Sequence, residues 1–298
     1  MSPATSTMVV ELSPPLDIPA TLAPLGRWGD DGLDRWDGDR SLRTIRIGPR
    51  AAPYLARSIG TIECPALEVA TAPGDLGLVA EAVASMFVSG GDPFAALVDS
   101  DLRIASLDAV YRGVRPMLHR DPLTALVRSI SAQQVNLRWA AEIRRRLAIA
   151  YGTLHTIDGQ EVRSLEAGPL AQASVADLRT LQLTTAKARS IIAVAQAVRD
   201  GDLELSELEA LDDEALVLSL ISLPGIGPWT ADWFLARTLG RPRVVAGDLG
   251  VRKAVGRVYL GGRLPSQAEV RDVTAHWGAA AGVAQQLVLH DLALGSPV

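Results

Sequence analysis

The residues that could do chemistry in this 298-residue chain gather in its last third. Asp248 is the only acid among seven Arg or Lys residues between positions 237 and 263. A carboxylate in such a setting can stabilise a developing positive charge or orient an attacking water molecule. Asp248 can also be the N-cap of a helix that begins at Leu249, which is the commoner role of a lone Asp. The two roles are compatible, and both place Asp248 at the start of a helix.

Two tryptophans precede this acid. Trp229 and Trp233 are four residues apart, which puts them on one face of a helix, so both can line one pocket. Aromatic faces attract cations, so such a pocket could hold a flat group that carries positive charge. Plain core packing is the alternative interpretation of this pair.

A tight turn must position these residues. Apolar residues recur at helical spacing over 213–223 and again over 224–239, and the two patterns meet at Pro224-Gly225-Ile226-Gly227. Glycine backbone amides at the start of a helix can approach an anion closely, and a DNA phosphate is the natural candidate. The alternative is a helix C-cap glycine followed by a helix that Pro initiates.

Two motifs in this region resemble a known family. Leu223-Pro-Gly-Ile-Gly-Pro-Trp-Thr-Ala231 and Ala246-Gly-Asp-Leu-Gly-Val-Arg252 resemble the helix-hairpin-helix DNA glycosylase superfamily, and within it the 3-methyladenine DNA glycosylase II family. The resemblance implies that Asp248 is catalytic and that Trp229 and Trp233 form the base pocket. It also implies DNA contacts by a set of hairpin and helix residues: Gly225, Ile226, Gly227, Thr230 and Arg252.

The same resemblance assigns two further sites. The family's Gln-Gln-Val-Ser pattern lies against the minor groove and supplies the residue that fills the gap left by an extruded base. The matching positions here are Gln133 and Gln134, with Asn136 in place of Ser, although both glutamines could simply cap helix ends. The backbone carbonyls of Ile221, Leu223 and Ile226 match positions that hold a monovalent Na or K ion.

The chain also departs from its relatives. Superfamily members that cut the strand carry a Lys two positions after the second hairpin Gly, where this chain has Trp229, so a monofunctional enzyme without AP lyase activity is expected. The family's W-x-P-W-R-x-x-A pattern becomes Trp277-Gly-Ala-Ala-Ala-Gly-Val-Ala284, and the helix after it, at 285–290, holds no aromatic residue. The substrate range therefore stays open.

Composition sets the remaining bounds. A chain with 48% apolar and 21% charged residues is typical of a globular protein, and no apolar run is long enough to span a bilayer, so we expect a cytoplasmic monomer acting on nucleoid-associated DNA. The single Cys64 excludes a four-cysteine iron–sulfur cluster, and no other cofactor is expected. The net charge is −5, but windows 103–150 and 237–263 each carry +6, while 202–214 holds seven acids and no base. This asymmetry predicts one basic face on an acidic body, or else ordinary solvated helix faces.

Patterning along the chain predicts a mostly α fold. Residues 1–20 are expected to be loosely ordered. Residues 21–98 are predicted to form an α+β subdomain with strands at 33–36, 42–47 and 66–70 and a helix at 75–88; the resembling family has a TATA-binding-protein-like domain here, and its role is expected to be structural. Residues 99–298 are predicted to be helical throughout, with helices at 121–130 and up to 151, a scaffold helix from 184, and the helix-hairpin-helix at 213–239.

The sequence thus predicts a monofunctional DNA glycosylase that flips and excises alkylated purines, such as 3-methyladenine, from duplex DNA in base excision repair. A module of another class, which binds damaged or distorted DNA through the same hairpin without catalysis, is the alternative.

Overall fold

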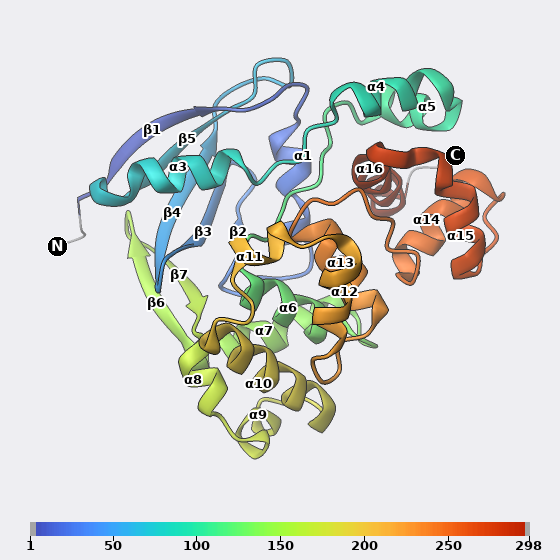
Figure 1. The fold of residues 1–298 in the computed structure, drawn as a ribbon. Helices are drawn as coiled ribbons and strands as arrows, with labels where there is room; N and C mark the ends of the chain where they lie inside the picture. The colour runs from blue at the N-terminus through green and yellow to red at the C-terminus, as the bar shows by residue number, and fades with distance from the viewer. Residues whose placement is uncertain (1–3, 296–298) are drawn as a thin grey trace.

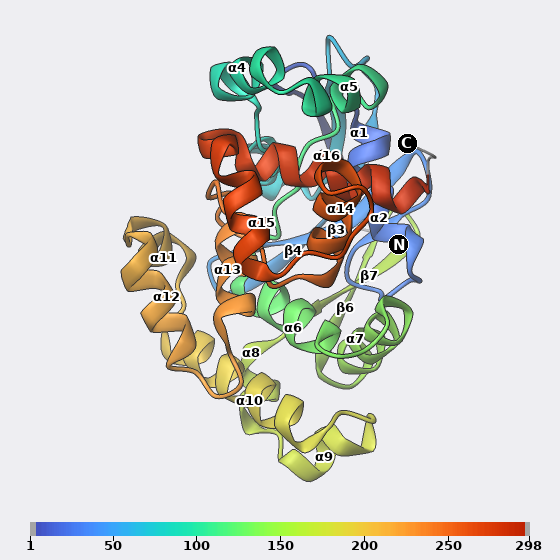
Figure 2. The same cartoon turned by 90° about the vertical axis from the view of Figure 1, so that its right-hand side faces the viewer.

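The computed structural model describes residues 4–295, in which a small antiparallel sheet packs beside two groups of helices (Figures 1 and 2). The sheet has the strand order β1-β5-β4-β3-β2. Its strands are β1 (Ser6–Glu11), β2 (Arg35–Trp36), β3 (Arg40–Ile47), β4 (Arg50–Ser58) and β5 (Ala66–Thr71). Alternate residues of β5 are buried, as expected for a strand with one face on the core. Helix α3 (Leu76–Ala84) covers that face and completes a core around Tyr54, Leu67 and Val69.

The order at the N-terminus corrects the sequence prediction. Residues 1–20 were expected to be loosely ordered, but β1 pairs along its whole length with β5, from Ser6 opposite Thr71 to Glu11 opposite Ala66. Residues 18–22 form helix α1 (Ile18–Leu22), whose N-cap Asp17 accepts the Ala20 amide, and α2 (Pro24–Arg27) follows. Residues 1–3 lie outside the described range.

The predicted strands of the α+β subdomain are confirmed within a few residues, but β1 and β4 were missed. A 3-10 turn, η1 (Pro73–Asp75), precedes α3, which ends at Ala84 rather than at 88. Two helices then cross to the far side of the molecule: α4 (Gly91–Ser100) and α5 (Leu102–Val110).

The middle of the chain forms the first helical group. It comprises α6 (Pro122–Ala132), α7 (Leu137–Tyr151), α8 (Ala167–Gln172), α9 (Val175–Thr180), α10 (Thr185–Asp200), α11 (Leu205–Ala210), α12 (Asp213–Ile221) and α13 (Pro228–Arg237). Asp121 caps α6 with Pro122 in its first turn, and Thr184 caps α10, as predicted. The prediction of uninterrupted helix is wrong at one place, because β6 (Gly152–Ile157) and β7 (Gln160–Leu165) form a hairpin that reaches back toward the main sheet.

The second helical group closes the chain. It consists of α14 (Leu249–Tyr259), α15 (Gln267–Thr274), the 3-10 segment η2 (Ala275–Ala280) and α16 (Ala281–Leu294), packed with α4 and α5 around a core of its own. Within this group α16 packs against α14, α5 and η2 (Figure 2). Within residues 4–295, no helix has the length and hydropathy needed to cross a membrane.

Candidate DNA-binding and base-excision site

The hairpin joins α12 to α13 and faces solvent. The second helix begins at Pro228, four residues later than predicted, with Gly227 as an N-cap that has no side chain to satisfy the first-turn amides. Gly225 is exposed and has a positive φ of 75°, and the Ile226 amide donates to the Leu223 carbonyl (3.1 Å). The helix start therefore presents backbone donors to solvent, which is the arrangement that binds phosphate.

Two of the predicted hairpin contacts are corrected by burial. The Ile226 side chain is 5% exposed and packs in the first helical core, so only its backbone can meet DNA. Thr230 is 1% exposed, and its hydroxyl lies within hydrogen-bond distance of Ser129 (3.4 Å) and of the Gln133 amide (3.3 Å). Its side chain supports the hairpin from below and does not form its surface.

The loop between α6 and α7 is tied to this hairpin. Gln133 donates from its side-chain amide to the Gly225 carbonyl as well as to Thr230, both at 3.3 Å. Gln134 is exposed and has a left-handed backbone (φ 56°), and Asn136 caps α7 by accepting the Trp139 amide. Lys187 fixes the same loop by donating to the Ser131 carbonyl (2.9 Å). The structure therefore puts Gln133 in a supporting contact and leaves Gln134 free to project outward.

The two hairpin glycines give a matched test. Gly225→Ala should destabilise the fold by about 1–2 kcal/mol, because the left-handed backbone disfavours a Cβ, and that Cβ would lie 2.0 Å from the Ser190 Oγ. Gly227→Ala should leave stability within about 0.5 kcal/mol, because its φ is −108° and its Cβ meets nothing within 4 Å. Urea unfolding measures both effects.

DNA affinity then separates the hairpin's two roles. If DNA contacts the hairpin backbone closely, Gly227→Ala should weaken binding of duplex DNA although it folds normally, as measured by fluorescence anisotropy at fixed salt. Unchanged affinity in that variant would contradict the predicted phosphate contact.

Asp248 caps helix α14, as the sequence predicted. Its Oδ1 accepts the Val251 amide (3.0 Å), and its Oδ2 accepts the indole N–H of Trp229 (3.3 Å). Gly250 leaves room for the carboxylate, since a Cβ there would lie 2.9 Å from Oδ1. The half-buried carboxylate is thus held by α13 on one side and by its own helix on the other.

A cavity of about 710 Å³ opens beside this acid, where the three hydrophobic cores meet. Leu249 and Gly250, the two residues after Asp248, form part of its wall. The other lining residues come from α1 and α2, from the chain around α6, and from α13, α14 and α16: Thr21, Pro24, Leu25, Arg27, Trp28, Met117, His119, Arg128, Leu137, Trp233, Arg237, Lys253, Gln286, Leu289, His290, Leu292 and Ala293. A cavity of this size can hold a purine base.

The two predicted pocket tryptophans are separated by the structure. Trp233 lines the cavity and stacks on His119, with ring centroids 5.9 Å apart and planes at 19°. Trp229 is absent from the lining and instead contacts Asp248. Trp233 therefore lines this cavity, while the indole of Trp229 turns toward the acid, and the shared base pocket stays a prediction.

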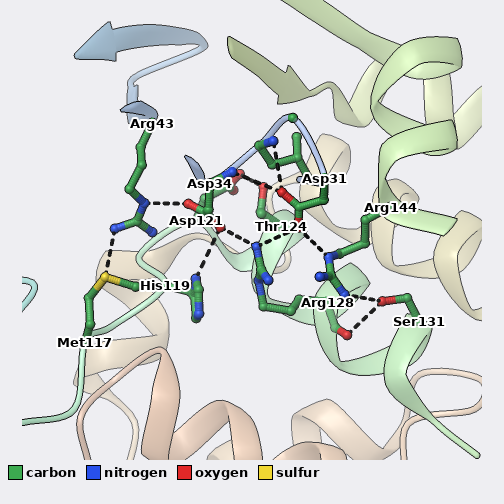
Figure 3. Close-up of polar contacts among 12 residues, drawn as sticks. Asp31, Asp34, Arg43, Met117, His119, Asp121, Thr124, Arg128, Ser131 and Arg144 are labelled. Carbon is green, nitrogen blue, oxygen red and sulfur yellow. Dashed lines mark hydrogen bonds and ion pairs between the residues drawn. The ribbon is translucent and has the colours of Figure 1, made fainter. Parts of the chain in front are cut away.

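A buried ion cluster, of which Arg128 reaches the cavity wall, joins the α+β subdomain to the helices (Figure 3). Asp34 pairs with Arg43 of β3 and with Arg128 of α6, while Asp31 accepts from Arg128 (3.2 Å) and Arg144 (2.7 Å). Burial by itself would raise the pKa of Asp34, but the positive charges of Arg43 and Arg128 hold it well below its usual range. Asp34 is therefore ionised.

His119 lies between this cluster and Trp233. Burial, reinforced by the charge of Arg128, lowers the pKa of His119 well below 6.5, so the ring is neutral at neutral pH. Burial also lowers the pKa of Arg237 to about 10, which leaves it charged, and its Nη1 donates to the Gln286 Oε1 (2.7 Å). Sequence patterns gave no signal for these residues, because each lies outside the motifs and reaches the cavity through tertiary packing.

The predicted basic face is largely neutralised in the structure. Many arginines of the two positive windows form ion pairs: Arg112 with Glu63, Arg120 with Glu209, Arg145 and Arg146 with Glu142, Arg241 with Asp213, Arg243 with Asp232, Arg257 with Asp291 and Arg263 with Glu269. Arg252 donates from Nε to the Pro265 carbonyl (2.8 Å), which leaves the rest of its guanidinium available for DNA. The net charges counted over residues 103–150 and 237–263 therefore overestimated the positive charge that the surface presents.

The C-terminal helix replaces the missing aromatics with polar groups. Trp277 is 2% exposed and donates to the Tyr259 hydroxyl (3.0 Å), so it is a core residue. Gln285 accepts the Val245 amide (2.7 Å) and thereby fixes the chain just before Asp248. Gln286, Leu289 and His290 face the cavity.

A helix-hairpin-helix, an acid at the start of the next helix and a purine-sized cavity beside it define the DNA glycosylase type of fold and site. A family model described as HhH-GPD superfamily base excision DNA repair protein matches residues 127–279. This chain belongs to that superfamily. A putative DNA-3-methyladenine glycosylase of Bacillus subtilis is 30% identical over 58% of this chain and 60% of that protein, and the chain spans about three fifths of the length of the first curated relatives that it matches.

Solved structures show the same fold over nearly the whole chain. A 3-methyladenine DNA-glycosylase from Archaeoglobus fulgidus has a TM-score of 0.85 at 21% identity, covering 98% of this chain and 100% of that one. An 8-oxoguanine glycosylase/lyase of Clostridium acetobutylicum, in complex with double-stranded DNA, has a TM-score of 0.75 at 15% identity and covers 97% and 98% of the two chains. The predicted fold class and the resemblance to the superfamily are confirmed.

Proposed function

We propose that the protein is a monofunctional DNA glycosylase that excises alkylated purines from duplex DNA and leaves an abasic site. The observation that carries this proposal is the Asp248 carboxylate, held beside a purine-sized cavity at the start of α14. As the bond between the sugar and the base breaks, positive charge develops on the sugar, and a fixed carboxylate stabilises it or orients the attacking water.

DNA would be held by the surface described above. The hairpin amides would bind a phosphate, Gln134 would fill the gap left by the extruded base, and Arg252 would contact the backbone. The carbonyls of Ile221, Leu223 and Ile226 would hold a Na or K ion at the hairpin, and we propose no other cofactor. Action as a monomer on nucleoid-associated DNA in the cytoplasm belongs to the same proposal.

The silent DNA-binding module is not favoured. A binder that recognised distorted DNA through the hairpin would need neither the carboxylate nor the cavity, and both are present. The relatives named for glycosylase activity support the same choice.

Base release from alkylated duplex DNA tests the proposal. The wild-type protein should release the base and produce strand breaks only after alkaline treatment. Absence of release across alkylated, deaminated and oxidised bases, together with salt-sensitive DNA binding, would favour the silent module.

The absence of lyase activity needs a separate experiment. The chain has two lysines, of which Lys187 donates to the Ser131 carbonyl and Lys253 lines the cavity. Because Trp229 occupies the lyase position, borohydride should trap no covalent complex with DNA. Trapping by the wild type that disappears in Lys253→Ala would show that the enzyme is bifunctional through a different lysine.

A further inference from the structure

The lining of the cavity carries positive charge. Four cationic side chains contribute to it: Arg27, Arg128, Arg237 and Lys253. Over the described residues 4–295, the lining includes neither Asp nor Glu, and the Asp248 carboxylate stands at its edge. The interior and the edge of the site therefore carry opposite charges.

These cations keep capacity for a ligand. Arg237 donates to the neutral amide of Gln286, and Lys253 is exposed and takes part in none of the salt bridges among residues 4–295. Arg128 pairs with two acids, but its Nε is buried without a hydrogen-bond partner in the described structure, and the same holds for Nδ1 of His119. Buried polar atoms of this kind are rare unless a ligand or water satisfies them.

The aromatic surface of the cavity is limited. Trp233 has one neighbour, His119, stacked on its ring, and the neutral imidazole adds no negative charge. Trp28 is the other lining tryptophan and is 42% exposed. A cationic base would meet little of the electron-rich surface that attracts it and several positive charges that repel it.

The charge of the base decides what its departure requires. When the glycosidic bond breaks, its electron pair stays on the base nitrogen and water adds its oxygen to the sugar carbon. The proton of that water ends on the base if the base was neutral in DNA, and passes to the solvent if the base was cationic. A purine that is neutral in DNA leaves with developing negative charge, which fixed cations stabilise. A base alkylated at N3 or N7 is cationic in DNA and leaves as a neutral molecule, so cations in the cavity weaken its binding.

We infer that this cavity selects damaged purines that are neutral in DNA, such as ethenoadenine and hypoxanthine, over the cationic 3-methyl and 7-methyl purines. The inference rests on the proposed function and shifts its substrate class toward purines that are neutral in DNA, which include deaminated as well as alkylated bases. It assigns the preference for neutral bases to three cations, Arg128, Arg237 and Lys253. Arg237 precedes Asp248 in the sequence and Lys253 follows it.

Single-turnover base release from duplexes with one lesion each tests the inference. Ethenoadenine, hypoxanthine and 7-methylguanine are compared, and each rate is divided by the spontaneous release rate of the same duplex, because cationic bases leave more readily by themselves. The wild type should accelerate release of the two neutral bases more than that of 7-methylguanine.

Lys253 gives the sharper measurement because its exposed side chain can be changed without loss of the fold. For each lesion, the acceleration is the enzymatic rate divided by the spontaneous rate. Lys253→Met should lower the ratio of the acceleration for the neutral bases to that for 7-methylguanine by about tenfold. Lys253→Glu should lower this ratio further. Arg271→Met removes one positive charge from the exposed surface of α15 and serves as the matched control.

The outcomes are distinct. If the wild type accelerated the release of 7-methylguanine more than that of the two neutral bases, the inference would be overturned and the glycosylase proposal would stand. An equal change of ratio in Arg271→Met and Lys253→Met would also overturn it, since the effect would then come from overall charge. Release of no base at all would overturn the proposed function itself.

Discussion

Asp248→Asn should lower the single-turnover rate of base release by about 100-fold or more, with little change in DNA affinity. Asparagine keeps one oxygen, which can accept the Val251 amide, so the cap on α14 survives, while the negative charge and the acceptor for the Trp229 indole are lost. Quantifying released base by chromatography, with enzyme in excess over DNA, measures the chemical step.

The control for this variant is Asp272→Asn, which makes the same charge change at an exposed position of α15. It should release base at the wild-type rate. If Asp248→Asn also kept full activity while binding DNA normally, the carboxylate would be only a helix cap and the catalytic assignment would be wrong.

Asp34→Asn should destabilise the protein by about 3–5 kcal/mol. The substitution leaves Arg43 and Arg128 buried beside a neutral group, and both form ion pairs with Asp34 in the intact protein (Figure 3). Urea unfolding at neutral pH measures the loss. Asp39→Asn, an exposed position near the same strands, should change stability by less than about 0.5 kcal/mol.

The pH dependence of this effect follows from the lowered pKa of Asp34. Its folded-state pKa lies below the unfolded value, so the stabilisation is fully present above the unfolded pKa and is lost as pH falls through the folded one. The stability difference between wild type and Asp34→Asn should therefore stay constant from about pH 5 to 8. A difference that vanished near neutral pH would show that the ion pairs contribute little.

Local patterns predicted the parts of the site that are built locally. The hairpin, the Asp248 cap and the Asn136 loop each depend on residues close in sequence, and the helical spacing around them is unambiguous. The start of α13 was placed too early because Pro224 and Pro228 both fit a first turn, and only the tertiary position of Gly225 against Ser190 decides between them.

Local sequence patterns could not predict the parts of the structure that depend on residues far apart in the sequence. Strand β4 contains Pro53 and several alanines, and β6 and β7 are rich in polar residues, so their stability comes from pairing and not from propensity. Arg128 meets Asp34 across 94 residues of sequence, and nothing near either residue signals the partner. The α+β subdomain was expected to be structural because no chemical motif is visible in it, and the structure adds that residues from Thr21 to Trp28 contribute to the cavity wall.

The cavity wall extends well outside the segment that identifies the family. Residues 127–279 carry the hairpin and Asp248, whereas Thr21 to Trp28, His119 and Gln286 to Ala293 lie before or after that segment. The cavity wall is thus shared: Arg128, Arg237 and Lys253 lie inside the family segment, whereas these outer stretches supply other parts of the wall. Exchanging the outer stretches between two such proteins would replace part of the cavity wall while leaving Asp248 and these three cations in place, so a match to the shared segment alone leaves part of the cavity undetermined.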